Sequence, residues 1–277
     1  TEHLLSVSSL TGTFTKKLNM ESIGNLAGLL HDFGKSSVRF QRYIMSASGL
    51  ISKDDFAYLD PVSNKGKIDH SSDGARLCMD TPYDGNYEKL SCELIAIAVM
   101  SHHTGLPDIC RPGKESSFDT RMSSDMNDSS EYSSDESYLT FKKYITDTIS
   151  RKCAVEIKSA IDNISKTKSR ETSYFRLGLI TRFLLSSLVD ADRLDTASFM
   201  SNVPITKQGR PNWEKMSDNL IRHLSQFDIK DKVNKIRDEV SECCASKASC
   251  PKGAYFLSVP TGGGKTLSSL RFAIKHA

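Results

Sequence analysis

Apolar residues recur at helical spacing along most of this chain, and sustained strand alternation is absent over the first 250 residues. The segment 20–31 places four apolar residues on one helical face: Ile23, Leu26, Ala27 and Leu30. Residues 91–102 and 172–190 are apolar nearly all round, which is typical of buried helices. Residues 212–225 and 229–243 have the pattern of amphipathic helices. The sequence therefore predicts a mainly α fold.

Composition sets the broad class of the protein. The 277 residues suffice for one large domain or two small ones, and the 38% hydrophobic and 26% charged residues are ordinary for a globular chain. A net charge of +3 is only mildly basic, so any phosphate-binding surface must be local. Seven irregularly spaced cysteines favour free thiols in a reducing cytoplasm. With neither a signal peptide nor an apolar run of about 20 residues, no membrane partner is expected.

Two segments have irregular composition. Residues 46–69 mix Gly, Asp, Pro and Lys, whereas residues 113–137 are rich in Ser and Asp. The second composition buries little apolar surface and predicts a mobile loop. Its acidity would repel a phosphate backbone, so we do not expect it to line a substrate path.

The end of the chain has a different character. Residues 253–259 have the pattern of a buried strand, and Pro260-Thr-Gly-Gly-Gly-Lys-Thr266 leads into a helical pattern. A glycine-rich turn between strand and helix is the setting of a P-loop, although Val259 replaces the first glycine of the general motif. We expect backbone amides around Gly262 and Gly264 to cradle phosphates, Lys265 to reach the terminal ones and Thr266 to help hold magnesium.

The tail resembles the opening of a superfamily 2 helicase domain. This predicts three parts: a helical first domain over 1–205, a helical linker region over 206–250, and the truncated start of a RecA-like domain over 251–277. The sequence ends eleven residues after Thr266 and begins without Met, as a trimmed piece of a longer chain would. We expect ATP and magnesium to be used by the full-length protein and no ATP hydrolysis by this fragment.

A His-Asp dipeptide, His31-Asp32, lies at the end of the first predicted helix. Such a pair can offer one imidazole nitrogen and one carboxylate to a metal. A carboxylate has two oxygens, so Asp32 can bridge two ions about 3.5–4 Å apart. The dipeptide alone is weak evidence, since it occurs by chance at solvated helix ends.

Further metal-ligating residue types fall near other predicted helix boundaries: His3, His70, His102, His103 and Asp192. Each has an ordinary explanation when taken alone. His3 can be a disordered end, His70 a turn residue, and the adjacent pair a helix cap that complements the helix dipole. Asp190 and Asp192 can both be solvated. Their joint occurrence favours a metal centre, because burying adjacent histidines without partners is costly.

The order of these residues resembles the HD superfamily, and the resemblance implies that the first predicted part, residues 1–205, is an HD metal-dependent nuclease domain. The matching elements are His3, His31-Asp32-Phe33-Gly34-Lys35 with Phe40-Gln41, His70-Ser71 with Gly74-Ala75, His102-His103, and Ala191-Asp192. The series is similar, more narrowly, to the HD nuclease domain of the CRISPR-associated nuclease-helicase of type I interference systems. The P-loop at the end supports this likeness independently, and the stretch after it extends the likeness toward the type I-C subgroup.

The resemblance implies an all-helical fold and one or two divalent ions. One ion would be held by His3, His31, Asp32 and Asp192, and the second by Asp32, His70, His102 and His103. Asp190 competes with Asp192, which we prefer because it follows a small residue, as in the family pattern. Imidazole and carboxylate ligands suit manganese, nickel, cobalt or iron better than calcium, with magnesium also compatible. We expect metal-activated water to attack phosphorus and Lys35 to bind the phosphate.

The resulting hypothesis is a metal-dependent nuclease that cuts single-stranded DNA in CRISPR antiviral defence. Its expected partners are a Cascade-type target-recognition complex and, in addition, an anti-CRISPR inhibitor protein. Two alternatives stay open: an HD phosphohydrolase acting on nucleotides, and a docking module that uses the helices between 212 and 243.

Overall fold

The structure is a computed structural model that describes residues 2–107, 113, 116–123, 136–164, 169–205, 211–228 and 231–277. Helices dominate these residues and no strand occurs among them, which confirms the mainly α prediction. No helix of the described chain is both long and apolar enough to cross a membrane. The cysteines that the structure describes are free, and Cys78, Cys92 and Cys153 are buried.

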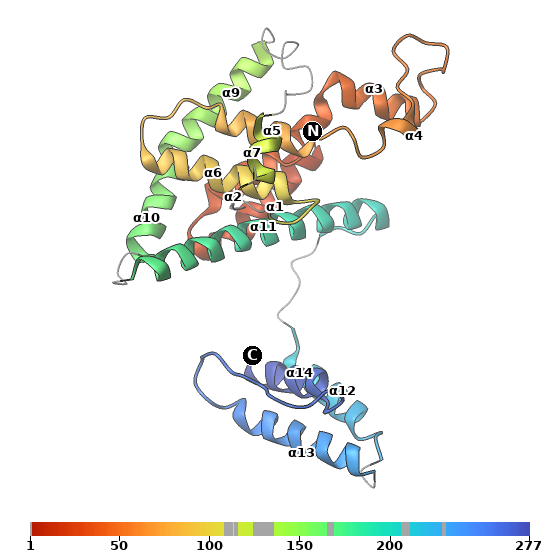
Figure 1. Ribbon diagram of the computed structural model, residues 1–277, viewed down its shortest axis with the longest axis vertical. Helices are drawn as coiled ribbons and strands as arrows, with labels where there is room; N and C mark the ends of the chain where they lie inside the picture. Colours follow the sequence, from red (N-terminus) through yellow and green to blue (C-terminus); the bar gives the residue numbers. More distant parts are fainter. Residues whose placement is uncertain are drawn as a thin grey trace. The chain divides into compact units, whose positions relative to one another are not determined.

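The chain divides into two compact units, residues 1–205 and 206–277 (Figure 1). The helices of the first unit are α1 (Glu2–Thr15), η1 (Lys16–Leu18), α2 (Glu21–Leu30), η2 (Phe33–Ser36), α3 (Val38–Ala47), α4 (Pro61–Asn64), α5 (Ser71–Met79), α6 (Asn86–Ser101), α7 (Ser117–Ser123), α9 (Glu136–Thr148), the π-helical turn η3 (Ile149–Cys153), α10 (Ala154–Ile164) and α11 (Arg170–Ser201). The second unit contains α12 (Trp213–Leu224), α13 (Lys232–Lys247) and α14 (Lys265–His276).

The core of the first unit forms around α6, which packs against α2, α5, α10 and α11. Its largest fully buried side chains include Ile23, Leu30, Ile95, Ile149 and Leu188, which lie on α2, α6, η3 and α11. The first unit thus brings the ends of α2 and α6 close to the start of α1 and to the middle of α11. Figure 1 shows α11 running as one long helix beside α1 and α2.

Glycines let α1 and α2 approach closely. A Cβ added at Gly28 would lie 2.6 Å from Cα of Ser8, and one added at Gly24 would lie 2.8 Å from the carbonyl oxygen of Thr11. These contacts are with backbone that cannot move aside, so the helix pair depends on the missing side chains. This packing places the first turn of α1 next to the last turn of α2.

Three sequence predictions need correction in the first unit. The predicted helix 172–190 extends to Ser201, so Asp192 lies inside α11 instead of after it. The segment 46–69, predicted to be irregular, includes α4. The segment 113–137, predicted as a mobile loop, contains the helix α7, which polar side chains tie to α5 and α6; residues 114–115 and 124–135 lie outside the described residues.

In the second unit, α14 packs against α12 and α13 around a small core that includes Leu220, Ala245 and Ile274. The strand predicted over 253–259 is absent from this part of the structure. Phe256 is 97% exposed instead of buried. A strand requires hydrogen bonds from a neighbouring strand, and no second extended segment pairs with this one among the described residues.

Candidate metal centre

His31 and Asp32 follow the last turn of α2 and are almost fully buried, with exposed fractions of 0% and 4%. Nδ1 of His31 lies 2.7 Å from the carbonyl oxygen of Gly28. Because a carbonyl oxygen only accepts, Nδ1 carries the proton and donates it to this bond. In the neutral ring, Nε2 then carries the lone pair that can bind a metal ion. This atom faces the carboxylate, 3.3 Å from Oδ2 of Asp32.

His102 is held in the same way at the end of α6. Its Nδ1 donates to the carbonyl oxygen of Val99 at 2.6 Å, and its Nε2 lies 3.7 Å from Oδ1 of Asp32. Nε2 of His31, Nε2 of His102 and Oδ1 of Asp32 are buried without a hydrogen-bond partner within the described structure. Each unsatisfied buried polar atom costs about 1–3 kcal/mol, so three converging acceptors fit a bound cation.

His3 reaches the same cluster from the first turn of α1. Its Nε2 lies 3.3 Å from Oδ1 of Asp192 and 3.7 Å from Oδ2 of Asp32. Its Nδ1 lies 2.6 Å from Oδ2 of Asp195, whose other oxygen accepts a hydrogen bond from Ser6. Asp195 thus selects the tautomer of His3 that presents Nε2 to the cluster.

The structure distinguishes the two late aspartates. Asp192 lies beside His3 and His31, whereas Asp190 is an exposed residue of the same helix. Asp195 was missed by the sequence reasoning. Its spacing of three residues from Asp192 places both carboxylates on one face of a helix, which was an available signal.

His70 and His103 form the more open side of the cluster. Nε2 of His70 lies 3.6 Å from Oδ1 of Asp32, and Nε2 of His103 lies 3.1 Å from Nε2 of His70. Burial lowers the pKa of His70, and burial together with the neighbouring histidines lowers the pKa of His103 to about 4. Both rings are therefore neutral at pH 7, the state in which imidazole binds a metal.

Asp32 occupies the middle of the cluster with its two oxygens turned to different partners. Oδ1 faces His70 and His102, and Oδ2 faces His3, His31 and Lys35. Burial raises the pKa of Asp32, but the histidines and the ammonium of Lys35 outweigh burial and hold that pKa far below its usual range. Asp32 is an ionised carboxylate, as a bridging ligand must be.

The seven predicted ligands form three overlapping sets of three residues. Within each set, the donor atoms lie within 4.8 Å of one another. The sets are His3, His31 and Asp192; then His31, Asp32 and His102; then Asp32, His70 and His103. The resemblance implied that His102 shares an ion with Asp32, His70 and His103. The structure instead groups His102 with His31 and Asp32. The donors, imidazole nitrogens and carboxylate oxygens, suit a divalent transition metal.

A comparison with family models agrees with this geometry. Residues 1–132 match the HD domain family. This HD domain match includes every histidine of the cluster and Asp32, and Asp192 lies beyond it. HD domains are helical and are generally metal-dependent phosphohydrolases. No curated protein matches the chain.

Arg121 of α7 joins the two segments that carry the open side of the cluster. Its Nε and Nη2 atoms each lie 3.0 Å from the carboxylate of Asp69, next to His70, and its Nη1 lies 2.9 Å from the carbonyl oxygen of Met100, two residues before His102. Burial raises the pKa of Asp69, but the guanidinium of Arg121 outweighs this and holds that pKa below its usual range. Arg121 thus positions His70 relative to His102, and the sequence reasoning did not identify it.

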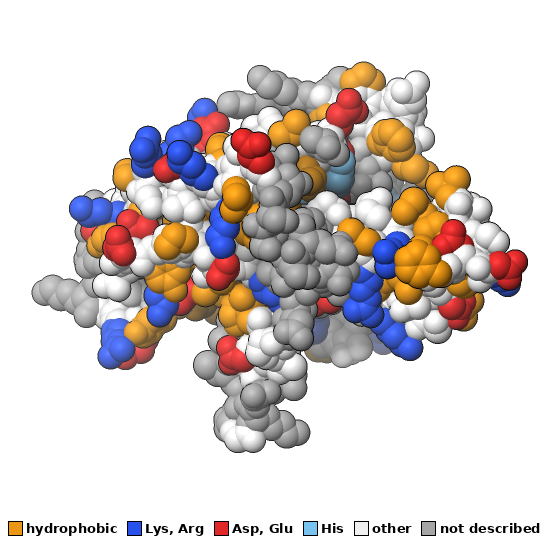
Figure 2. Space-filling model, turned by 90° about the horizontal axis from the view of Figure 1, so that it is seen from above, with side chains coloured by type: hydrophobic (Ala, Val, Ile, Leu, Met, Phe, Trp, Pro, Cys, Tyr) orange, Lys and Arg blue, Asp and Glu red, His pale blue; other side chains and the backbone are white. Residues whose placement is uncertain are grey.

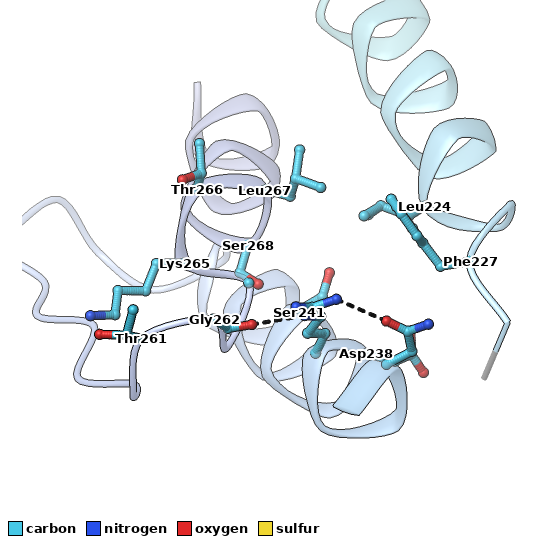
Figure 3. A pocket seen from close by; sticks show the side chains of 13 residues that line it. Leu224, Phe227, Asp238, Ser241, Thr261, Gly262, Lys265, Thr266, Leu267 and Ser268 are labelled. Atoms are coloured by element: carbon cyan, nitrogen blue, oxygen red, sulfur yellow. Dashed lines mark hydrogen bonds between the residues drawn. The ribbon is translucent and has the colours of Figure 1, made fainter. Parts of the chain in front are cut away.

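The predicted phosphate loop lies in the second unit, beside a cavity of about 510 Å³ (Figure 3). Gly262 and Gly264 have φ of 83° and 81°, which glycine adopts without strain, and α14 starts at Lys265. Figure 3 shows Leu224 at the end of α12 and Phe227 in the turn after it, with Lys265 pointing away from them. Arg237 donates a hydrogen bond from Nε to the carbonyl oxygen of Gly262 at 2.8 Å.

Proposed function

We propose that the HD domain is a divalent-metal-dependent nuclease that hydrolyses the phosphodiester bonds of single-stranded DNA. The observation that carries this proposal is the convergence of three unsatisfied buried acceptors, Nε2 of His31, Nε2 of His102 and Oδ1 of Asp32, on one place in the fold. Metal-dependent phosphohydrolysis is the general chemistry of HD domains. The choice of a DNA diester as substrate is our extension.

Divalent ions, when bound, would lower the pKa of water and neutralise charge on phosphate oxygens. The residues of the chain prepare the site for this. Backbone carbonyls fix the rings of His31 and His102, and Asp195 fixes that of His3, so that all three present Nε2 inward. Lys35 contacts Asp32 at 2.5 Å from a rim position where its side chain is 43% exposed. When a bound ion balances the charge of Asp32, the ammonium of Lys35 becomes available to bind a phosphate.

The shape of the rim favours a polymer over a free nucleotide. His103 is exposed, and the side chains of His3 and Lys35 are 35% and 43% exposed. Figure 2 shows a face of the molecule on which a histidine side chain reaches the surface. A nucleotide hydrolase usually encloses its substrate in a pocket with groups that read the base. A long strand can reach this exposed rim from solvent.

The phosphate loop gives the nuclease its proposed context. We propose that Gly262, Gly264, Lys265 and Thr266 hold ATP and magnesium in a longer helicase protein that delivers single-stranded DNA to the HD domain. The support is the order of the two motifs in one chain and the positive φ of both glycines. In this proposal the protein acts in CRISPR defence with a target-recognition complex, and an inhibitor protein would act on the same surfaces.

The test is cleavage of circular single-stranded DNA by the chain with manganese or nickel. We expect cutting that a chelator stops and that Asp32→Ala abolishes. Asp190→Ala, which changes an exposed aspartate of α11 outside the cluster, should cut like the wild type. Hydrolysis of nucleoside phosphates without any cutting of DNA would refute the nuclease and favour the nucleotide phosphohydrolase.

A further inference from the structure

An excursion of the chain, residues 37–68, begins and ends at the candidate metal centre. It is called the arm here and contains α3 and α4, which pack against each other, while α3 also packs against η2. η2 carries Lys35, whose Nζ lies 2.5 Å from Oδ2 of Asp32. Directly after the arm comes Asp69-His70, with Nε2 of His70 lying 3.6 Å from Oδ1 of Asp32. A polymer bound along the arm would therefore extend to Asp32.

The root of the arm is fixed to the cluster. A Cβ at Gly34 would lie 2.2 Å from the carbonyl oxygen of His70, so η2 and the start of α5 touch through backbone. Nε2 of Gln41 donates to the carbonyl oxygen of Lys35 at 2.6 Å, which ties α3 to η2. The ring of Phe40 lies 5.1 Å from that of His70. Beyond this root, Figure 1 shows α3 and α4 projecting from the other helices of the first unit.

The arm presents positive charge to solvent. It has five basic residues, Arg39, Arg42, Lys53, Lys65 and Lys67, and three acidic ones, Asp54, Asp55 and Asp60. Two of the acids are engaged locally. Oδ1 of Asp55 accepts from the amide of Ala57, and Asp60 accepts from two amides at the start of α4. The three lysines are exposed, so the surface favours a polyanion.

Aromatic rings accompany these cations. Phe56 is 93% exposed, and the guanidinium of Arg42 lies over its ring at 5.7 Å. The half-buried ring of Phe40 lies near those of His70 and Tyr43, with ring centroids 5.1 and 6.1 Å away. Exposed aromatic faces beside cations are the usual platform for unpaired bases. Figure 2 shows Lys and Arg side chains beside large hydrophobic ones on the side of the view where α3 and α4 project in Figure 1.

We propose that the arm is a single-stranded DNA guide, in which Phe56 and Phe40 stack on bases and Arg42 and the arm lysines contact phosphates. The proposal rests on the proposed nuclease function for its choice of polymer. A protein partner is the competing occupant, since Leu50 and Val62 are 78% and 86% exposed. The basic and aromatic residues that continue to His70 favour DNA, because a protein partner has no need to reach the cluster.

The experiment measures binding of a fluorescein-labelled dT20 strand by anisotropy, with a chelator present so that nothing is cleaved. The test variant is the whole chain with Arg42→Ala and Phe56→Ala. Its matched control is Phe175→Ala with Arg182→Ala, an exposed phenylalanine and an exposed arginine of α11. Arg182, the nearer of the two, is ten residues from Asp192, or about 15 Å along the helix.

We expect the arm variant to bind dT20 at least about tenfold more weakly, with a shallower dependence on salt, and the control to bind like the wild type. Equal affinity of the arm variant and the wild type, or equal weakening by the control, would overturn the proposal. So would an equal loss of affinity for a duplex of the same length, because paired bases cannot stack on Phe56.

A second measurement separates this proposal from the proposed function. Manganese-dependent hydrolysis of bis(p-nitrophenyl) phosphate requires the metal centre but no DNA guide. We expect the arm variant to hydrolyse DNA more slowly and the small diester as fast as the wild type does. A parallel loss of activity on the small diester would overturn a dedicated DNA guide. A wild-type chain that binds dT20 through the arm yet hydrolyses neither substrate would refute the nuclease and leave the arm as a DNA-binding surface.

Discussion

Oδ2 of Asp195 lies 2.6 Å from Nδ1 of His3. The two residues lie on α11 and α1, which are far apart in the sequence and contact each other in the folded chain. This contact leaves Nε2 of His3 as the ring atom that faces Asp192. We predict that Asp195→Asn weakens manganese binding by about 10–100-fold, the usual cost of losing a carboxylate that orients a ligating histidine. Calorimetric titration would measure it, with Asp190→Asn as control. Unchanged affinity in Asp195→Asn would show that the orientation of His3 does not matter.

Lys35 balances the charge of Asp32 when no ion is present. Lys35→Met should therefore destabilise the metal-free protein by about 1 kcal/mol, or about 2–4 °C in Tm, and the manganese-loaded protein less. Lys142→Met is the control, because Lys142 pairs with Asp80 at 2.6 Å outside the cluster. Its shift in Tm should be the same with and without metal. If the shift in Tm of Lys35→Met were also the same with and without manganese, Lys35 would have no charge-balancing role.

The α1–α2 contact gives a prediction about stability. Gly28→Ala would place a methyl group 2.6 Å from Cα of Ser8 and should cost about 1–3 kcal/mol. Gly178→Ala on α11 meets nothing within 4 Å and should stabilise the protein by about 0.5–1 kcal/mol. Urea unfolding of the two variants measures both signs. A neutral Gly28→Ala would mean that the two helices separate easily.

Arg121→Ala would leave the partly buried carboxylate of Asp69 without its bidentate partner. We expect a loss of about 2 kcal/mol, less than for a fully buried pair. Because Arg121 holds the pKa of Asp69 below its usual value, this contribution is present above about pH 4 and fades as the pH falls further. Unfolding measured from pH 6 to pH 2 should therefore show the two proteins converging in acid. A constant difference would indicate that Arg121 acts through packing alone.

The open side of the cluster makes the metal-free protein sensitive to mild acid. His103 has its pKa lowered to about 4 in the folded chain, so the unfolded chain binds a proton at higher pH. Stability should fall as the pH drops from about 6.5 toward 4, and His103→Gln should reduce this dependence. Thermal unfolding in a chelator at several pH values tests it. An identical pH dependence in the variant would exclude His103 as a source.

Much of the fold follows from helical periodicity, which indicated α2, α6, α12 and α13 in places close to the observed ones. It did not predict the strand-free conformation of residues 253–259, because a strand depends on partners elsewhere. It also ended the third apolar helix too early. Residues 191–201 continue α11 with a mixture of polar and apolar side chains of which only Ala191 is buried, so the pattern of a buried helix ends before the helix does.

The candidate site was predicted from residue type and order, and the structure gathers all seven proposed ligands. Asp195 and Arg121 were missed for a common reason. Each acts by orienting another residue across the fold, Asp195 from α11 to α1 and Arg121 from α7 to the ends of α5 and α6. The spacing of Asp192 and Asp195 indicates a shared helix face, but the partner of that face depends on distances between helices, which residue order does not specify.

The glycine contact between α1 and α2 has a consequence for the metal centre as a whole. His3 and His31 are anchored to helices whose backbones already touch, so their separation has little room to adapt to ions of different size. His103 follows α6 on the exposed rim, where its side chain reaches solvent. The cluster therefore combines a stiff part, held by backbone contacts, with a more compliant edge at His103. An ion in the stiff part would be selected by its radius, and ligands would exchange with solvent at the edge.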